Sequence, residues 1–130
     1  MPVEIGMRGE AAAVVAQEDT AQAVGSGLVP VFATPRMIAL MEQAAVNAVQ
    51  SALEPGQGTV GTRLDVKHSA ATPVGMKVRA QAEVICVEGR QVVFLVTAFD
   101  EAEQIGGGTH ERFIIQTDKF LARAQGKLNG

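Results

Sequence analysis

Glu42 and His68 are polar side chains placed where the local pattern calls for apolar ones, and together they could move a proton. Glu42 falls about 120° from the centre of the polar face of a predicted helix, among apolar neighbours. A carboxylate in that position loses hydration unless a partner holds it. His68 closes the apolar face of a predicted strand, and a histidine that is neutral at physiological pH is suited to acid–base catalysis. The structural alternatives are a carboxylate that reaches solvent at the helix edge and a hydrogen-bonded core histidine.

Thr34 stands at the start of the same helix and adds a hydroxyl group. We predict that it is the N-cap, because Pro35 suits the first helical position. The N-terminus of a helix carries free N–H groups and a partial positive charge, which can stabilise an oxyanion. A hydroxyl, a carboxylate two turns along and an imidazole on a facing strand would supply a nucleophile, a base and an acid for acyl transfer.

The helix that would position these groups runs from about Pro35 to Leu53 and ends at Glu54-Pro55-Gly56. Its polar face is a single stripe formed by Arg36, Gln43, Asn47 and Gln50. The opposite face is apolar and broad. Such a helix needs other structure on most of its sides.

After this helix the apolar period changes from that of a helix to the period of two that is typical of strands. One predicted strand, Arg8–Ala16, precedes the helix, and four follow it: Thr59–His68, Met76–Val87, Arg90–Phe99 and Ile105–Thr117. The last residues, Gln125–Gly130, are predicted to be a frayed tail. Within the second strand, the alternation places Val60, Thr62, Leu64, Val66 and His68 on one face. These elements predict an α+β fold in which an antiparallel β-sheet wraps around one long central helix. We also expect a dimer, because aromatic core residues are scarce.

Length and composition fit one domain over residues 1–130 and narrow the function classes. The net charge is −3 and no basic patch is visible, so we expect no nucleic-acid partner. No apolar run is long enough for a membrane span and no signal peptide is visible, so we expect a cytoplasmic protein with no membrane partner. The single cysteine, Cys86, is predicted to be a buried core residue without a disulfide. The two histidines, His68 and His110, lack the spacing of a metal site, and the glycines at 106–108 lack the rest of a phosphate loop, so we expect neither metal nor cofactor.

Five segments carry a further signal. They are Val31–Pro35, Leu40–Glu42, Gly58–Thr62, His68–Pro73 and Gly106–Arg112. As a set, in this order and near this spacing, they resemble the fluoroacetyl-CoA thioesterase-like family of hot-dog proteins, and the resemblance spans about Val31 to Leu121.

The resemblance implies a hot-dog enzyme, a homodimer or a higher oligomer, that cleaves a short-chain acyl-CoA thioester to free acid and CoA. It implies that Thr34, Glu42 and His68 are catalytic and that the Gly61 backbone and Arg112 contact the substrate. CoA enters as part of the substrate.

The chain departs from the fluoroacetyl-specific member of the family in one respect. That member has an aromatic, lid-like segment ahead of its helix and an aromatic residue just after the catalytic glutamate. Here the stretch from Gln17 to Pro30 has no aromatic residue, and Gln43 follows Glu42. We therefore expect general short-chain acyl-CoA hydrolysis rather than selectivity for a fluorinated acyl group.

Two other functions fit the same residues. The first is hydration or dehydration of an enoyl thioester, which needs a histidine and a carboxylate but no hydroxyl nucleophile, so that Thr34 argues mildly against it. The second is a non-catalytic acyl-CoA-binding dimer, which predicts binding of CoA without turnover.

Overall fold

Helix α2 (Thr34–Val49) is the element around which the rest of the protein is built. The computed structural model describes residues 2–130, and in it a 3₁₀ turn, η2 (Gln50–Ala52), continues α2 to within one residue of its predicted end. Its buried side chains are Met37, Leu40, Met41, Ala44, Ala45, Ala48 and Val49. The broad apolar face predicted from the sequence is therefore confirmed.

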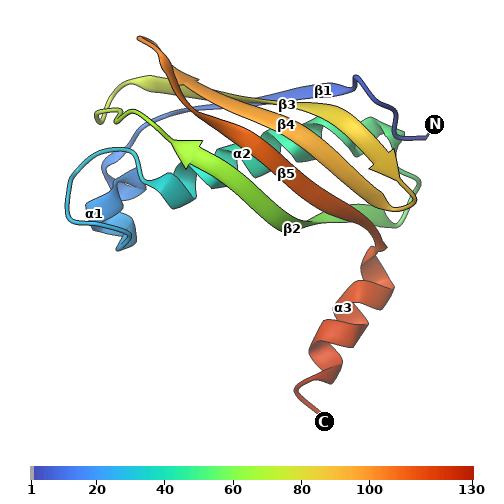
Figure 1. Ribbon diagram of the computed structural model, residues 1–130. Coiled ribbons are helices and arrows are strands. Elements are labelled where there is room, and N and C mark those ends of the chain that lie inside the picture. The colour runs from blue at the N-terminus through green and yellow to red at the C-terminus, as the bar shows by residue number, and fades with distance from the viewer. Residues whose placement is uncertain (1) are drawn as a thin grey trace.

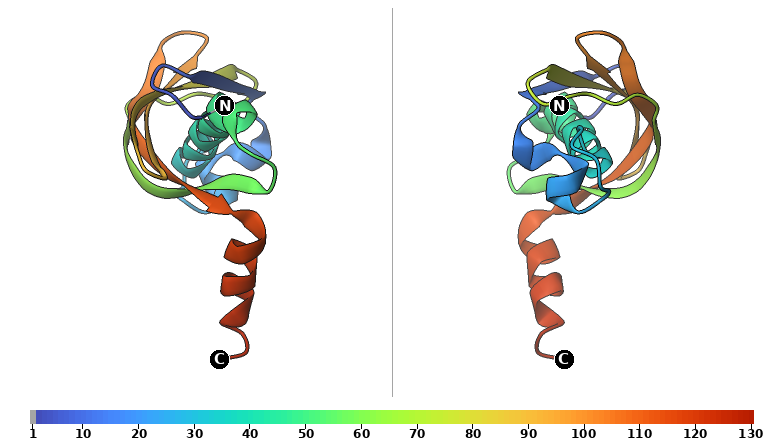
Figure 2. Two further views of the ribbon diagram at one scale, coloured as in Figure 1. Left: turned by 90° about the vertical axis from the view of Figure 1, so that its right-hand side faces the viewer. Right: turned by 90° about the vertical axis from the view of Figure 1, so that its left-hand side faces the viewer.

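Five strands form one antiparallel sheet in the order β1-β3-β4-β5-β2. Their bounds are β1 (Arg8–Val14), β2 (Gln57–His68), β3 (Lys77–Glu88), β4 (Gln91–Asp100) and β5 (Gln104–Gln116). Successive hairpins join β3, β4 and β5, while β1 pairs with β3 and β2 pairs with β5. Seen along the helix, the sheet curves around α2, which lies on its concave side (Figure 2). The predicted α+β architecture is confirmed.

Helix α2 packs mainly on β1 and β3, and much less on β2. Close approach to β1 depends on Gly9, because a Cβ atom there would overlap the backbone of Ala44 and Ala48. Larger side chains such as Phe94 fill the space between the helix and the middle of the sheet. The inner face of β2 stays largely open, and Leu64 on that face is 38% exposed.

A β-bulge in β2 changes which residues face the helix. The register with β5 shifts between Gly61 and Arg63, so that Thr62 is the extra residue. Before the bulge, Thr59 and Gly61 point inward, as their contacts with Arg112 and Glu42 show. The prediction that Val60 and Thr62 share a face with His68 is therefore wrong, because strict alternation was assumed through the bulge.

A second bulge, in β3, corrects the prediction for Cys86. The register with β4 shifts between Val84 and Cys86, which places Cys86 opposite Val93 instead of on the core side. The thiol is exposed rather than buried. The apolar run around it gave no sign of the extra residue.

Three helical segments lie outside the sequence prediction. The turn η1 (Gln17–Asp19) and the short α1 (Ala21–Val24) precede α2, and α3 (Thr117–Gly126) follows the last strand. Figure 1 shows α3 projecting away from the sheet, and none of its residues is buried. The predicted frayed tail is wrong at Gln125 and Gly126, which belong to α3. Across residues 2–130, none of the helices has the length and hydropathy needed to cross a membrane.

Candidate active site

The start of α2 meets the end of β2, and this junction brings Thr34 next to His68. Thr34 Oγ1 lies 2.7 Å from His68 Nδ1. Backbone hydrogen bonds fix both sides of the contact: the Ala33 N–H donates to the Asp19 carbonyl over 2.9 Å, and the Ser69 N–H donates to the Ile105 carbonyl over 2.7 Å. A hydroxyl in hydrogen-bond contact with an imidazole is the arrangement that activates an alcohol for acyl transfer.

Thr34 is free to make this contact because it is not the N-cap. The cap position belongs to Ala33, which has no side-chain hydrogen bond, and Thr34 is the first residue of the helix. The predicted capping role is therefore wrong. The prediction failed because the helix begins at Thr34, one residue earlier than the position of Pro35 suggested.

The surroundings of the His68 ring favour its neutral form. Burial lowers its pKa, and the neighbouring Ala70 carbonyl opposes this effect only in part. Nε2 is buried and has no hydrogen-bond partner within residues 2–130. A neutral ring that carries its proton on Nε2 leaves Nδ1 free to accept the Thr34 O–H, as a general base requires.

The N-terminus of α2 supplies one backbone donor beside the Thr34 hydroxyl. Pro35 has no N–H, and the N–H groups of Arg36 and Met37 both donate to the Ala33 carbonyl over 3.0 Å. The Thr34 N–H has no hydrogen-bond partner among the described residues. This amide, with the partial positive charge of the helix end, can stabilise a developing oxyanion.

A cavity of about 330 Å³ opens onto the Thr34–His68 contact. On one side it is lined by α1 and the loop that follows, including Ser26, Gly27 and Val29. On the other it is lined by the chain just after β2, from Ser69 to Ala71. The hydroxyl and the imidazole are thus reachable from a pocket whose walls combine small residues with the apolar side chains of Val29, Val31 and Phe32.

Glu42 belongs to a second group of side chains further along α2. Its Oε2 accepts a hydrogen bond from Arg112 Nη1 over 3.4 Å. Arg112 is anchored in turn to β2, where Nε donates to Thr59 Oγ1 and Nη2 to the Thr59 carbonyl, both over 2.9 Å. The Arg112 side chain is 7% exposed and that of Glu42 is 38% exposed. Burial lowers the pKa of Arg112, and the Glu42 carboxylate opposes this effect.

Gly61 allows the Glu42 carboxylate to approach β2. A Cβ atom on Gly61 would lie 2.7 Å from Glu42 Oε2 and 3.3 Å from Arg112 Nη1. The two predicted substrate contacts, Gly61 and Arg112, therefore lie beside Glu42. The φ angle of Gly61 is not positive, so the close approach of Glu42, rather than a left-handed backbone, is what calls for glycine here.

The structure places the five predicted residues in two groups. Thr34 and His68 form one, and Glu42, Gly61 and Arg112 form the other. Eight residues of helix separate Thr34 from Glu42, which corresponds to about 12 Å along the axis. A substrate that touches both groups must extend along α2.

The sequence analysis did not single out His110, which belongs to the second group. Its ring is fully buried and lies between Arg112 and the Arg63 carbonyl. The signal that could have found it is the two-residue spacing from Arg112, which places both side chains on the inner face of β5.

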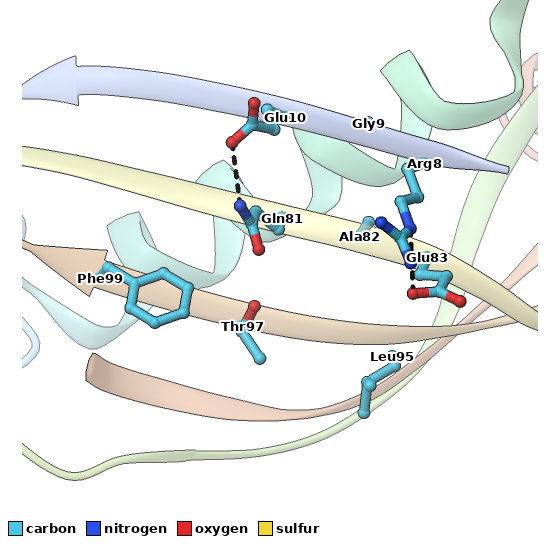
Figure 3. A pocket seen from close by; sticks show the side chains of 9 residues that line it. All are labelled: Arg8, Gly9, Glu10, Gln81, Ala82, Glu83, Leu95, Thr97 and Phe99. Atoms are coloured by element: carbon cyan, nitrogen blue, oxygen red, sulfur yellow. Dashed lines mark hydrogen bonds and ion pairs between the residues drawn. The ribbon is translucent and has the colours of Figure 1, made fainter. Parts of the chain in front are cut away.

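Another hollow, of about 500 Å³, lies on the outer face of the sheet (Figure 3). Its charged walls are already paired: Arg8 Nε lies 3.2 Å from Glu83 Oε1, and Gln81 Nε2 donates to Glu10 Oε1 over 3.1 Å. The helix lies behind the strands that carry this hollow, so that the sheet separates the hollow from α2 (Figure 3). Within residues 2–130, no three His, Cys, Asp or Glu side chains are arranged to hold a metal ion.

Comparison with solved structures defines the class of protein. The chain matches the fluoroacetyl-CoA thioesterase FlK with a TM-score of 0.92 and 39% sequence identity, over 98% of each chain. It matches a thioesterase superfamily member from Thermus thermophilus with a TM-score of 0.87 and 32% identity, over 95% of this chain and 92% of that one. The fold is the hot-dog fold, as predicted.

Sequence comparison narrows the class to a family. The family described as fluoroacetyl-CoA-specific thioesterase, FlK, matches residues 15–118. The fluoroacetyl-CoA thioesterase of Streptantibioticus cattleyicolor is 48% identical over 97 residues, which are 75% of this chain and 70% of that protein. The chain belongs to the FlK family of thioesterases, and the prediction of a thioester hydrolase is confirmed.

Proposed function

We propose that this protein hydrolyses short-chain acyl-CoA thioesters to free acid and CoA, with Thr34, Glu42 and His68 as its catalytic residues. The observation that carries the proposal is the 2.7 Å contact between Thr34 Oγ1 and His68 Nδ1 at the N-terminus of α2. The family supports the substrate class, since structures of FlK hold fluoroacetate with CoA, or acetyl-CoA.

In the proposed reaction, Thr34 supplies or orients the nucleophile at the thioester carbonyl carbon. His68 Nδ1 takes the proton of the attacking oxygen, and the Thr34 N–H, or the Gly61 N–H of a second copy of the chain, donates to the oxyanion. The C–S bond breaks, and the proton passes from His68 to the departing sulfur, so that CoA leaves as a thiol. If Thr34 itself attacks, its ester is then hydrolysed by a water molecule that His68 deprotonates; the proton returns to the Thr34 oxygen and the free acid departs. Glu42 lies about 12 Å from Thr34 along α2 of the same chain, so in this scheme the Glu42 that orients the water comes from a second copy of the chain.

The cavity at Thr34 favours a short acyl group without selectivity for fluorine. Ala21, Ser26, Gly27 and Val29 line it from residues 17–30, a segment without an aromatic side chain, and Phe32, which also lines it, follows that segment. Val29 in this lining is 57% exposed, and the neighbouring Leu28, which does not line the cavity, is 89% exposed. We expect acetyl-CoA and fluoroacetyl-CoA to be hydrolysed at similar rates.

We propose that the enzyme is a homodimer whose interface lies near the candidate residues. The inner face of β2 supports this, because α2 covers it little and Leu64 remains exposed on it. Arg112 and Glu42 lie at the same side of the helix, where a second copy would exclude water from the carboxylate. Light scattering after gel filtration tests the state directly: a mass of twice 13.6 kDa or a larger multiple is expected, and a monomer at micromolar concentration contradicts the proposal.

An acyl-CoA panel with detection of the free thiol tests the function. Acetyl-, fluoroacetyl-, butyryl- and octanoyl-CoA are compared on the wild-type protein, and release of thiol should be fastest for the shorter acyl groups. Binding of these compounds without thiol release would favour the acyl-CoA-binding dimer. Addition of water to crotonyl-CoA without thiol release would favour the hydratase.

A further inference from the structure

His110 makes contacts that the proposed reaction does not use. Its ring is fully buried on the inner face of β5 and stacks on Phe94, with ring centroids 6.1 Å apart. Nδ1 lies 2.8 Å from the Arg63 carbonyl, and Nε2 lies 3.1 Å from Arg112 Nη1. Both ring nitrogens are therefore engaged, one by the backbone of β2 and one by the guanidinium.

These partners determine the tautomer. A guanidinium can only donate, so Nε2 must carry a lone pair. A carbonyl can only accept, so Nδ1 must carry the proton. His110 is thus a neutral ring with its proton on Nδ1, and protonation of Nε2 would both remove the acceptor and place a second cation 3.1 Å from Arg112.

The bond from Arg112 to His110 completes the set of contacts that orients the guanidinium. Of its five N–H groups, one on Nε and one on Nη2 are taken by Thr59, and the two on Nη1 are taken by His110 and Glu42. The Nη1–Glu42 contact, at 3.4 Å, is the longest of them. Without the His110 acceptor, the planar guanidinium is held only at Nε and Nη2, both by Thr59, so the whole group can tilt about these two bonds and carry Nη1 away from the carboxylate.

We propose that His110 is a positioning residue: as a neutral acceptor it aims Arg112 Nη1 at Glu42 and so fixes the carboxylate for the reaction. This inference rests on the proposed catalytic role of Glu42. In this role His110 does not contact the substrate.

The surroundings of His110 keep the ring neutral. Burial lowers its pKa, and the positive charge of Arg112 lowers it further, while the Arg63 carbonyl and the carboxylates of Glu42 and Glu111 oppose these effects. Phe94, packed against the ring from β4, contributes no charge.

Two substitutions separate positioning from packing. In His110→Gln, the side-chain oxygen can occupy the place of Nε2 and accept from Arg112; in His110→Asn, the amide can replace only Nδ1 and reach the Arg63 carbonyl. Both lose the ring that stacks on Phe94, so they form a matched pair for stability. We expect His110→Asn to lower kcat for thiol release by about ten- to a hundredfold, the range for losing one hydrogen bond to a charged group. His110→Gln should recover most of this rate at an equal unfolding midpoint.

A double-mutant cycle with Arg112→Gln shows whether His110 acts through Arg112. If it does, His110→Asn lowers kcat much less in the Arg112→Gln background than in the wild type. Equal losses in both backgrounds, or equal kcat for the Asn and Gln variants, would overturn the proposal in favour of a packing role.

A spectroscopic readout keeps this test apart from the proposed function. Long-range ¹H–¹⁵N correlation spectra of the wild-type protein identify the protonated ring nitrogen of His110, with His110→Gln as the assignment control. A neutral ring with its proton on Nδ1 is expected to persist as pH falls past about 6.5, where an ordinary histidine becomes charged. The other tautomer or a cationic ring would refute the inference, whether or not the protein hydrolyses acyl-CoA. Absence of hydrolysis with the expected tautomer would refute the proposed function and, with it, the catalytic purpose of the contact.

Discussion

Gly61→Ala should lower catalysis while leaving the fold intact, because the new methyl group meets a movable carboxylate rather than the backbone. The Cβ atom would lie 2.7 Å from Glu42 Oε2, whereas ordinary contacts begin at 3.4 Å; it would also lie 3.1 Å from His110 Cε1 and 3.3 Å from Arg112 Nη1, so these two buried side chains must shift by a few tenths of an ångström. The Glu42 carboxylate must therefore move away from β2 by about 0.7 Å. Its hydrogen bond from Arg112 is already 3.4 Å long, so this shift breaks it.

The expected changes in kcat and in stability follow from the displacement of the Glu42 carboxylate. Misplacement of a catalytic group by about 1 Å costs up to a hundredfold in rate, so we expect kcat to fall by about ten- to a hundredfold. The free energy of unfolding should stay within about 1 kcal/mol of the wild type, because alanine is favoured over glycine in a strand by a similar amount. The Glu42 side chain, 38% exposed, has room to yield.

Gly58→Ala on the same strand is the matched control. Its Cβ would meet Thr117 Oγ1 at 3.3 Å and Ile115 Cδ1 at 3.9 Å, and neither atom belongs to the candidate site. The assay is thiol release from acetyl-CoA, together with urea unfolding of both variants. Full activity in a folded Gly61→Ala protein would refute the view that the position of Glu42 matters.

Three further predictions concern other residues. Thr34→Ser should keep most of the activity and Thr34→Ala should lose most of it, with little change in melting temperature for either, because Thr34 is not the helix cap; thiol release and thermal unfolding measure both. Burial lowers the pKa of His68. As pH falls, kcat/KM should therefore stay high past the ordinary histidine pKa of about 6.5 and decline only when the His68 ring becomes protonated at lower pH. A pH–rate profile measures this, and the same profile of His110→Gln shows whether the decline belongs to His68 rather than to His110. Burial acts to raise the pKa of Asp100, but hydrogen bonds from the Ala102 N–H, the Thr72 hydroxyl and the Glu103 N–H outweigh it, so that the pKa lies below its ordinary value. The ionised Asp100 carboxylate therefore stabilises the folded protein at pH values above the ordinary carboxyl pKa. This stabilisation is lost as pH falls through the lowered pKa of the folded protein. Urea unfolding should find Asp100→Asn less stable than the wild type at neutral pH, and this difference should shrink in acid.

The regular elements and the displaced polar side chains could be predicted from the sequence. Apolar periodicity, residue types and turn signals together indicated α2 and all five strands, and the azimuth of Glu42 suggested a carboxylate in need of a partner, which the contact with Arg112 confirms. That partner, Arg112, comes from a strand seventy residues away. Only the resemblance to a family, and not periodicity, pointed to it.

The parts that could not be predicted depend on local departures from regular geometry. The bulge at Thr62 adds one residue to β2 without any break in the apolar pattern, so the inward positions on its two sides differ by one. The same effect in β3 turned Cys86 outward. His110 acquires its role from the Arg63 carbonyl and from Arg112 together, and a backbone acceptor on a neighbouring strand leaves no trace in the sequence.

The central claim is that the Thr34–His68 contact performs thioester hydrolysis, and the kcat of His68→Ala tests it most directly. The measurement is thiol release from acetyl-CoA at saturating substrate, with gel filtration to show that the variant keeps the wild-type oligomeric state. Because a general acid–base residue contributes about 10²–10⁴-fold, the account predicts a loss of that order. A folded His68→Ala protein that turns over acetyl-CoA at the wild-type rate would contradict it.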